Sequence, residues 1–227
     1  MPGLRVAVIG AIALLCATRA VGAEDTPVAA HIAVAVCDLE TVSPSLLVAA
    51  EQVASDVYRD IGIEVDWIEN GCDQDGRALA VSLIPRAMAD IDVSDLTLGF
   101  ANSRSSQATV LYDRVQSFAH RYRMRHEVLL GYVIAHELGH LLLPPKSHSP
   151  AGLMRATIDI EMASARRLRF TGDQGALIAA RVKDAPGYTA AARPQNCCDA
   201  RRAPSAMAAS LPQTTSGSTA AWPTQVP

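Results

Sequence analysis

The sequence predicts an α+β fold with a mixed, mostly parallel twisted sheet. A βαβ unit starts this fold, a long buried helix follows the sheet, and a short C-terminal part contains a turn and a helix. Two observations carry the prediction. First, a β-branched run at His31–Val36 is followed by a helical pattern from Ser43-Pro44 and by an alternating run at Ile63–Ile68. Second, a continuous apolar helix is expected at about Met124–Leu143.

The βαβ unit has clear boundaries. Ser43 is placed to cap a helix whose first position is Pro44, and Gly62 is placed to end it. Between them, apolar residues recur at helical spacing: Leu46, Leu47, Ala50, Val53, Ala54, Val57 and Tyr58. A strand, a helix and a strand in fewer than 40 residues predict two parallel strands joined by a right-handed crossover.

Three further strands are expected. Leu79–Ile84 is the third strand and is stopped by Pro85. Leu96–Ala101 and Thr109–Val115 are two more, joined by a polar loop at Asn102–Gln107.

Two helices complete the fold. The long helix at about Met124–Leu143 must end at Pro144-Pro145, because proline restricts the residue before it to extended conformations. A last helix is expected after the capping-box pattern Thr171–Gln174, with Ala176–Val182 in its interior.

The two ends of the chain are expected to lie outside the folded domain. Met1–Ala23 has the basic start, the short apolar middle and the small final residues of a signal peptide, with cleavage near Ala23. A lipoprotein signal at Cys16 is disfavoured because Leu15 stands where a small residue is needed. Residues 190–227 are rich in Ala, Pro, Ser and Thr and are expected to be disordered, which leaves one domain at residues 24–189.

Charge and export limit the possible partners. Removing Arg5 and Arg19 with the signal peptide leaves 18 of the 20 basic residues against 23 acidic ones, so the net charge moves from −3 to −5. No nucleic-acid partner is expected from this balance. The mature chain is expected to be secreted or periplasmic, without stable membrane association.

Cysteines other than Cys16 number four, and export makes disulfides possible. Cys37 and Cys72 both follow the ends of the two parallel strands of the βαβ unit, so we expect them to pair. Cys197 and Cys198 are adjacent, and a bond between neighbours is strained. They could pair with each other or with another chain, remain free, or provide a thiolate to a metal.

The segment His136-Glu137-Leu138-Gly139-His140 carries the chemistry. Residues four apart lie on one face of a helix, so His136 and His140 can share one metal ion. Zn²⁺ suits two imidazoles, and the neighbouring Glu137 can act as a general base toward water. The expectation of such a pattern arising by chance in this chain is below about one per cent. Two histidines and a glutamate in a buried helix also need a partner, and a metal provides one.

A third zinc ligand is needed, and the sequence offers alternatives. His148 follows the proline pair, so a turn after the helix could return it to the metal. Glu161 is the rival, because a glutamate from a later helix could complete the site in a gluzincin-like way. Asp159 is a weaker version of that alternative.

The segment His136–Met154 resembles the metzincin clan of zinc peptidases, with the pattern H-E-x-x-H-x-x-G-x-x-H and a downstream methionine turn. The resemblance implies that His136, His140 and His148 are zinc ligands, that Glu137 is the general base, and that Met154 is the methionine of the Met-turn. The chain departs from the clan in two ways. Seven residues instead of five separate His140 from His148, and a leucine stands at the position of the clan's glycine.

The resemblance also implies a substrate. An extended peptide or protein segment would pair with the edge strand, so Gly99, Phe100 and Ala101 are the expected contacts. The chain is thus interpreted as a secreted zinc metalloendopeptidase with one catalytic Zn²⁺. The alternatives are a zinc-binding interaction module without turnover, hydrolysis of a non-peptide amide, and a gluzincin-like peptidase that uses Glu161.

Overall fold

A five-stranded sheet forms the base of the molecule. The computed structural model describes residues 30–39, 42–68, 78–85 and 97–184. The sheet order is β2-β1-β3-β5-β4, and every neighbouring pair is parallel except β4 with β5. The strands are β1 (Ala30–Asp38), β2 (Ile63–Ile68), β3 (Leu79–Ile84), β4 (Gly99–Asn102) and β5 (Gln107–Leu111). The predicted α+β class with a mixed, mostly parallel sheet is confirmed.

The chain enters the sheet through the predicted βαβ unit. Helix α1 (Pro44–Arg59) starts where Ser43 Oγ accepts a hydrogen bond from the Leu46 N–H at 3.4 Å. It is followed by Gly62 at φ +76°, a conformation that glycine adopts without steric cost. Strands β1 and β2 then pair in parallel, with Ala30 opposite Ile63.

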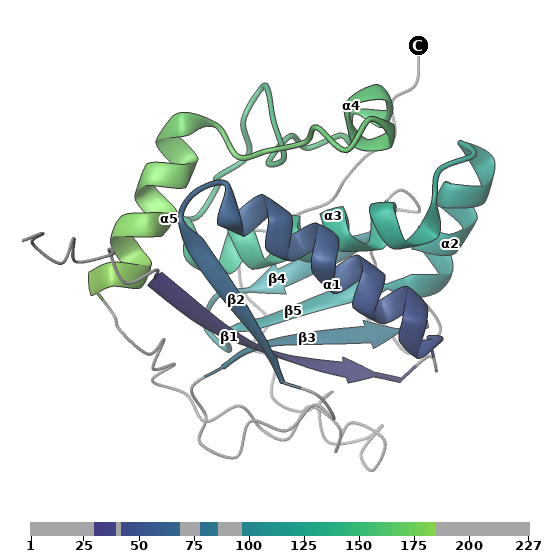
Figure 1. Ribbon diagram of the computed structural model, residues 1–227, viewed down its shortest axis with the longest axis horizontal. Helices are drawn as coiled ribbons and strands as arrows, with labels where there is room; N and C mark the ends of the chain where they lie inside the picture. The colour runs from purple at the N-terminus through teal and green to yellow at the C-terminus, as the bar shows by residue number, and fades with distance from the viewer. Residues whose placement is uncertain (1–29, 40–41, 69–77, 86–96, 185–227) are drawn as a thin grey trace, which may run out of the picture.

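Helices α1 and α3 (His126–Leu142) lie side by side over the sheet (Figure 1). They approach closely at Gly131, where a Cβ atom would lie 2.5 Å from the Ala50 carbonyl oxygen and 2.6 Å from Val53 Cβ. The buried Tyr58 hydroxyl donates to the Ala135 carbonyl at 3.1 Å, so α1 also holds α3 through a polar contact. Helix α3 is therefore held by contacts with both the sheet and α1.

One strand prediction is wrong over half of its length. Residues 109–111 belong to β5, but Tyr112 begins helix α2 (Tyr112–Arg121), so the predicted strand Thr109–Val115 is too long. Tyr112, Val115 and Ala119 are all buried and recur at helical spacing, so packing of the α2 face outweighs the strand preference of the Thr-Val-Leu-Tyr run. The neighbouring strand β4 begins at Gly99, later than predicted; Leu96 lies outside the described residues.

The C-terminal part packs around the end of α3. It contains the short helix α4 (Ile160–Ser164), which carries Glu161, and α5 (Gly172–Asp184). In the part of the chain that the structure describes, no helix combines the length and apolar character needed to cross a membrane.

Several predictions fall outside the described residues. Cys37 is buried in β1, but Cys72, Cys197, Cys198, the signal segment and the tail are not described. The predicted Cys37–Cys72 disulfide, the signal peptide and the disordered tail therefore stay predictions.

Candidate metal centre

Helix α3 carries two histidines into the interior. Its residues are apolar on all sides, and His136 is fully buried while His140 is partly buried. The helix ends at Leu143, whose ψ of 161° is the extended conformation that the following Pro144 requires. Because His136 and His140 are one turn apart, their rings project from the same face of α3.

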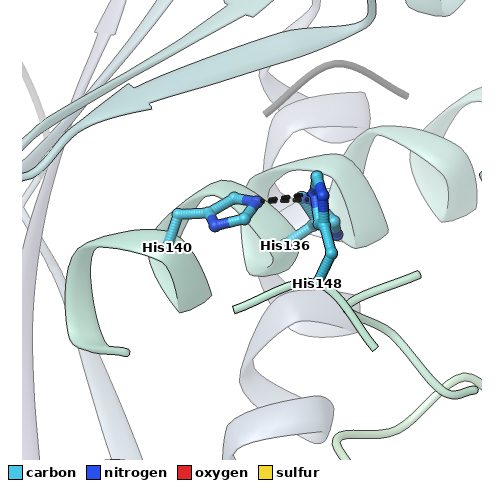
Figure 2. A group of neighbouring side chains, drawn as sticks. All are labelled: His136, His140 and His148. Atoms are coloured by element: carbon cyan, nitrogen blue, oxygen red, sulfur yellow. Dashed lines mark hydrogen bonds between the residues drawn. The ribbon is translucent and has the colours of Figure 1, made fainter. Parts of the chain in front are cut away.

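His148 returns to this face from the loop that follows α3. Its Nε2 lies 3.1 Å from His140 Nε2, which in turn lies 3.0 Å from His136 Nε2. One nitrogen from each ring falls within 4.8 Å of the others (Figure 2). Within the described residues, this is the group of histidine, cysteine and carboxylate side chains that could hold a metal ion, and it fits an H-E-x-x-H…H motif.

The separations of His140 Nε2 from the other two ring nitrogens suit zinc. When two nitrogens bind the same tetrahedral zinc ion at Zn–N distances of about 2.0–2.1 Å, they lie about 3.3–3.4 Å from each other. The observed separations of 3.0 and 3.1 Å are close to that value. Three imidazoles without a carboxylate or thiolate among them form a donor set that zinc accepts in hydrolytic sites, with one position left for water or substrate.

The opposite ring nitrogens of the two helical histidines already have partners. His136 Nδ1 lies 2.9 Å from the Leu153 carbonyl oxygen, so it must carry a proton and donate. His140 Nδ1 lies 3.1 Å from Ser147 Oγ. A metal-binding imidazole typically donates its other N–H in this manner, which fixes the ring and leaves Nε2 unprotonated.

Burial keeps the three rings neutral. It lowers the pKa of His136 well below the usual range, and the neighbouring His140 lowers it further. Burial, followed by the charge of His148, lowers the pKa of His140 to about 3. The pKa of His148 is also lowered by burial. Near neutral pH the rings are therefore available as ligands without first losing a proton.

Glu137 is the polar side chain without a partner at this site. It is 1% exposed, and neither carboxylate oxygen has a hydrogen-bond partner among the described residues. Burial raises the pKa of Glu137 well above its usual range. An unpaired buried carboxyl group is costly to a fold, so its presence indicates a ligand or a catalytic role.

Strand β4 leaves room for this carboxyl group at Gly99. A Cβ atom on Gly99 would lie 2.9 Å from Glu137 Oε1, 3.0 Å from Glu137 Cγ and 2.9 Å from the Thr109 carbonyl oxygen. The Glu137 side chain therefore lies against the backbone of β4. Phe100 and Ala101, the other two predicted substrate contacts, are partly buried on the same strand.

Met154 lies beneath α3. It is fully buried, and a Cβ atom on Gly139 would lie 2.7 Å from Met154 Sδ. The turn that carries it is closed by a hydrogen bond from the Ser149 N–H to the Met154 carbonyl. The adjacent Leu153 carbonyl is the acceptor for His136, so this turn contacts the cluster through its backbone.

The rival ligands lie elsewhere. Glu161 is exposed on α4 and Asp159 accepts from the Met162 N–H as the cap of that helix. Asp159 also forms an ion pair with Arg155. Neither carboxylate belongs to the three-histidine cluster, so the described structure does not bring the gluzincin-like alternative together.

Sequence reasoning missed the groups that orient the ligands. Ser147 and the Leu153 carbonyl contact the histidines. Gly99 was predicted as a substrate contact, but its position against Glu137 was not predicted. A backbone carbonyl has no sequence signal. Ser147 precedes His148, and that position is the only cue that the sequence provides.

Comparisons with known proteins give two distant structural alignments. No protein-family model matches the sequence, and no curated protein matches it. A zinc-dependent peptidase from Methanocorpusculum labreanum aligns with a TM-score of 0.44 at 15% identity, over 65% of this chain and 98% of that one. Archaemetzincin from Methanopyrus kandleri aligns with a TM-score of 0.44 at 13% identity, over 70% of this chain and 99% of that one. The chemistry of the site has to be inferred from the side chains of this chain.

Proposed function

We propose that this chain is a zinc-dependent peptidase in which His136, His140 and His148 bind the metal and Glu137 is the general base. The observation that supports this most directly is the convergence of three Nε2 atoms beside a buried carboxyl group with no other partner. Ligands alone would be enough for a zinc-binding interaction module. The unpaired Glu137 is costly to bury and is not needed for metal binding by three histidines, which favours a role in proton transfer.

The residues around the cluster account for the steps of hydrolysis. Zinc bound there would supply Lewis acidity, polarising the scissile carbonyl and making water a nucleophile near neutral pH. Glu137 accepts a proton from water while the water oxygen forms a bond to the carbonyl carbon. It then delivers that proton to the amine nitrogen as the C–N bond breaks. A nearby cation favours the charged form of Glu137 and so opposes the effect of burial on its pKa.

Strand β4 supports a peptide as the substrate. It is the last strand of the sheet order, and its backbone lies against Glu137 at Gly99. An extended peptide could add to this edge through backbone hydrogen bonds, with Gly99, Phe100 and Ala101 as its contacts. Its scissile bond would then run past both Glu137 and the three histidines.

The test is zinc content and turnover measured on the same preparation. Wild-type chain is expected to hold one zinc per molecule and to cleave a mixed peptide library. Glu137→Gln keeps the shape of the side chain but cannot accept the proton. We expect it to retain zinc and to lose about 10²–10⁴-fold in hydrolysis rate.

Three results would contradict the proposal. Stoichiometric zinc with no cleavage by the wild-type chain would favour the interaction module. Cleavage by Glu137→Gln at the wild-type rate would remove Glu137 from the mechanism. Cleavage of a simple amide, but of no peptide, would favour the non-peptide alternative.

A further inference from the structure

We propose that Gln174, on the distant helix α5, is a positioning residue for the metal site, and that it acts through Ser147. This inference rests on the proposed function, because it explains how the long connection after α3 holds a third ligand. Seven residues separate His140 from His148, and the loop contains Lys146 at φ +64°. A left-handed backbone at a non-glycine residue is costly, so contacts outside the loop must stabilise this conformation.

Gln174 supplies such a contact. Its Nε2 donates to the Ser147 carbonyl oxygen at 3.0 Å, although the two residues are 27 positions apart in the chain. The side chain is only 8% exposed. The same amide also completes the capping box of α5, because its Oε1 accepts from the Thr171 N–H at 3.2 Å. The reciprocal bond runs from the Gln174 N–H to Thr171 Oγ1 at 3.4 Å.

Ser147 links this anchor to two ligands. Its Oγ lies 3.1 Å from His140 Nδ1, which would donate to it when Nε2 of the same ring binds the metal, and the next residue in the chain is His148. A shift of the Ser147 backbone would therefore move the acceptor of His140 and the ring of His148 together. The side-chain amide of Gln174 thus caps the start of α5 with its oxygen, and it holds the loop between His140 and His148 with its nitrogen.

The double use explains why glutamine suits this position better than glutamate. A capping box accepts either residue, because only an acceptor is needed for the Thr171 N–H. The Ser147 carbonyl needs a donor, which an ionised glutamate lacks. Gln174→Glu therefore preserves the α5 cap and removes the loop anchor, and it separates the two roles with almost no change in shape.

The experiment measures zinc affinity by competition with a chromophoric chelator on the full-length chain, for wild type, Gln174→Glu and Ser147→Ala. Partners that orient a ligand typically contribute 10- to 100-fold in metal affinity, so each variant is expected to weaken zinc binding by about that factor. Because both residues act along one path, the double variant should lose less than the product of the two single effects. The absorption spectrum of bound Co²⁺ should also change in Gln174→Glu, because the ligand geometry changes.

Exposed Gln116 on α2 provides a matched control. Gln116→Glu makes the same chemical change outside the site and should leave zinc affinity unchanged. The metal-free Gln174→Glu variant should unfold at a somewhat lower temperature than wild type, because the Ser147 carbonyl loses its donor. Its helix content by circular dichroism should match wild type, which shows that α5 remains capped.

The outcomes separate this proposal from the proposed function. Wild-type zinc affinity and an unchanged Co²⁺ spectrum in Gln174→Glu would overturn the positioning role and leave the peptidase proposal intact. If the wild-type chain binds zinc but cleaves nothing, the peptidase proposal fails, while the affinities still decide the role of Gln174. If the wild-type chain binds no zinc, both fail.

Discussion

Helix α3 and the loop at residues 143–154 supply the same histidine cluster but hold their side chains in different ways. His136 is fully buried in a helix packed against both the sheet and α1, so the fold itself places it. His148 is exposed on a loop without regular structure, and hydrogen bonds from other parts of the chain hold that loop. The helix supplies a rigid half of the site, and the loop supplies a half that can be adjusted independently of the core.

Removing a ligand from each region gives the largest expected difference. His136→Ala should abolish tight zinc binding and also destabilise the metal-free protein, by about 1–3 kcal/mol, because the Leu153 carbonyl loses its buried donor. His148→Ala should weaken zinc binding by more than about 100-fold, beyond the effect of a residue that only orients a ligand. It should leave the metal-free stability within about 0.5 kcal/mol, because the side chain is exposed. Chelator competition and denaturant unfolding measure the two quantities.

Glu161→Ala is the control for the loop ligand. Glu161 is exposed on α4 and outside the cluster, so its removal should leave zinc affinity unchanged. A Glu161→Ala variant without zinc, together with a His148→Ala variant that retains it, would restore the gluzincin-like alternative.

The sequence predicted the helical half of the site better than the loop half. The pattern H-E-x-x-H within an apolar helix was enough, because helical geometry alone brings positions 136 and 140 together. The βαβ start and the Thr171–Gln174 capping box are also confirmed, since local residue preferences and packing agree there. The conformation of the loop could not be predicted, because it depends on tertiary contacts such as the hydrogen bond between Gln174 and Ser147, which are 27 positions apart.

Gly99→Ala tests whether Gly99 sets the position of Glu137. Its expected effect is smaller than that of removing a metal ligand. The new methyl group would overlap Glu137 Oε1 and the Thr109 carbonyl, so the carboxyl group must move. A displacement of about 1 Å at a catalytic group can cost about 100-fold, so we expect a 10- to 100-fold loss of peptide hydrolysis with zinc retained. Steady-state kinetics and zinc analysis check this. An unchanged rate would mean that Gly99 does not set the position of Glu137.

Gly131→Ala tests the rigidity of the helical half alone and should have the smallest effect on the site. A Cβ atom there would overlap the Ala50 carbonyl and Val53, so α1 and α3 must separate. Overpacking of this kind costs about 1–3 kcal/mol, which exceeds the helix preference of alanine over glycine of roughly 1 kcal/mol. We expect a lower thermal midpoint with zinc stoichiometry retained.

Gly172→Ala is the matched control for both glycine variants. A Cβ atom at Gly172 meets nothing within 4 Å, so this change should be neutral or slightly stabilising. Equal destabilisation by Gly131→Ala and Gly172→Ala would contradict the close contact between the helices.

The exposed position of His148 has a consequence for the rate at which metal is exchanged. Opening the loop would detach one ligand and uncover the ion while α1, α3 and the sheet remain folded, because local opening requires much less free energy than global unfolding. We therefore expect zinc to leave and re-enter the native protein without unfolding of the core. The lifetime of the bound metal should then depend on the loop that follows the proline pair.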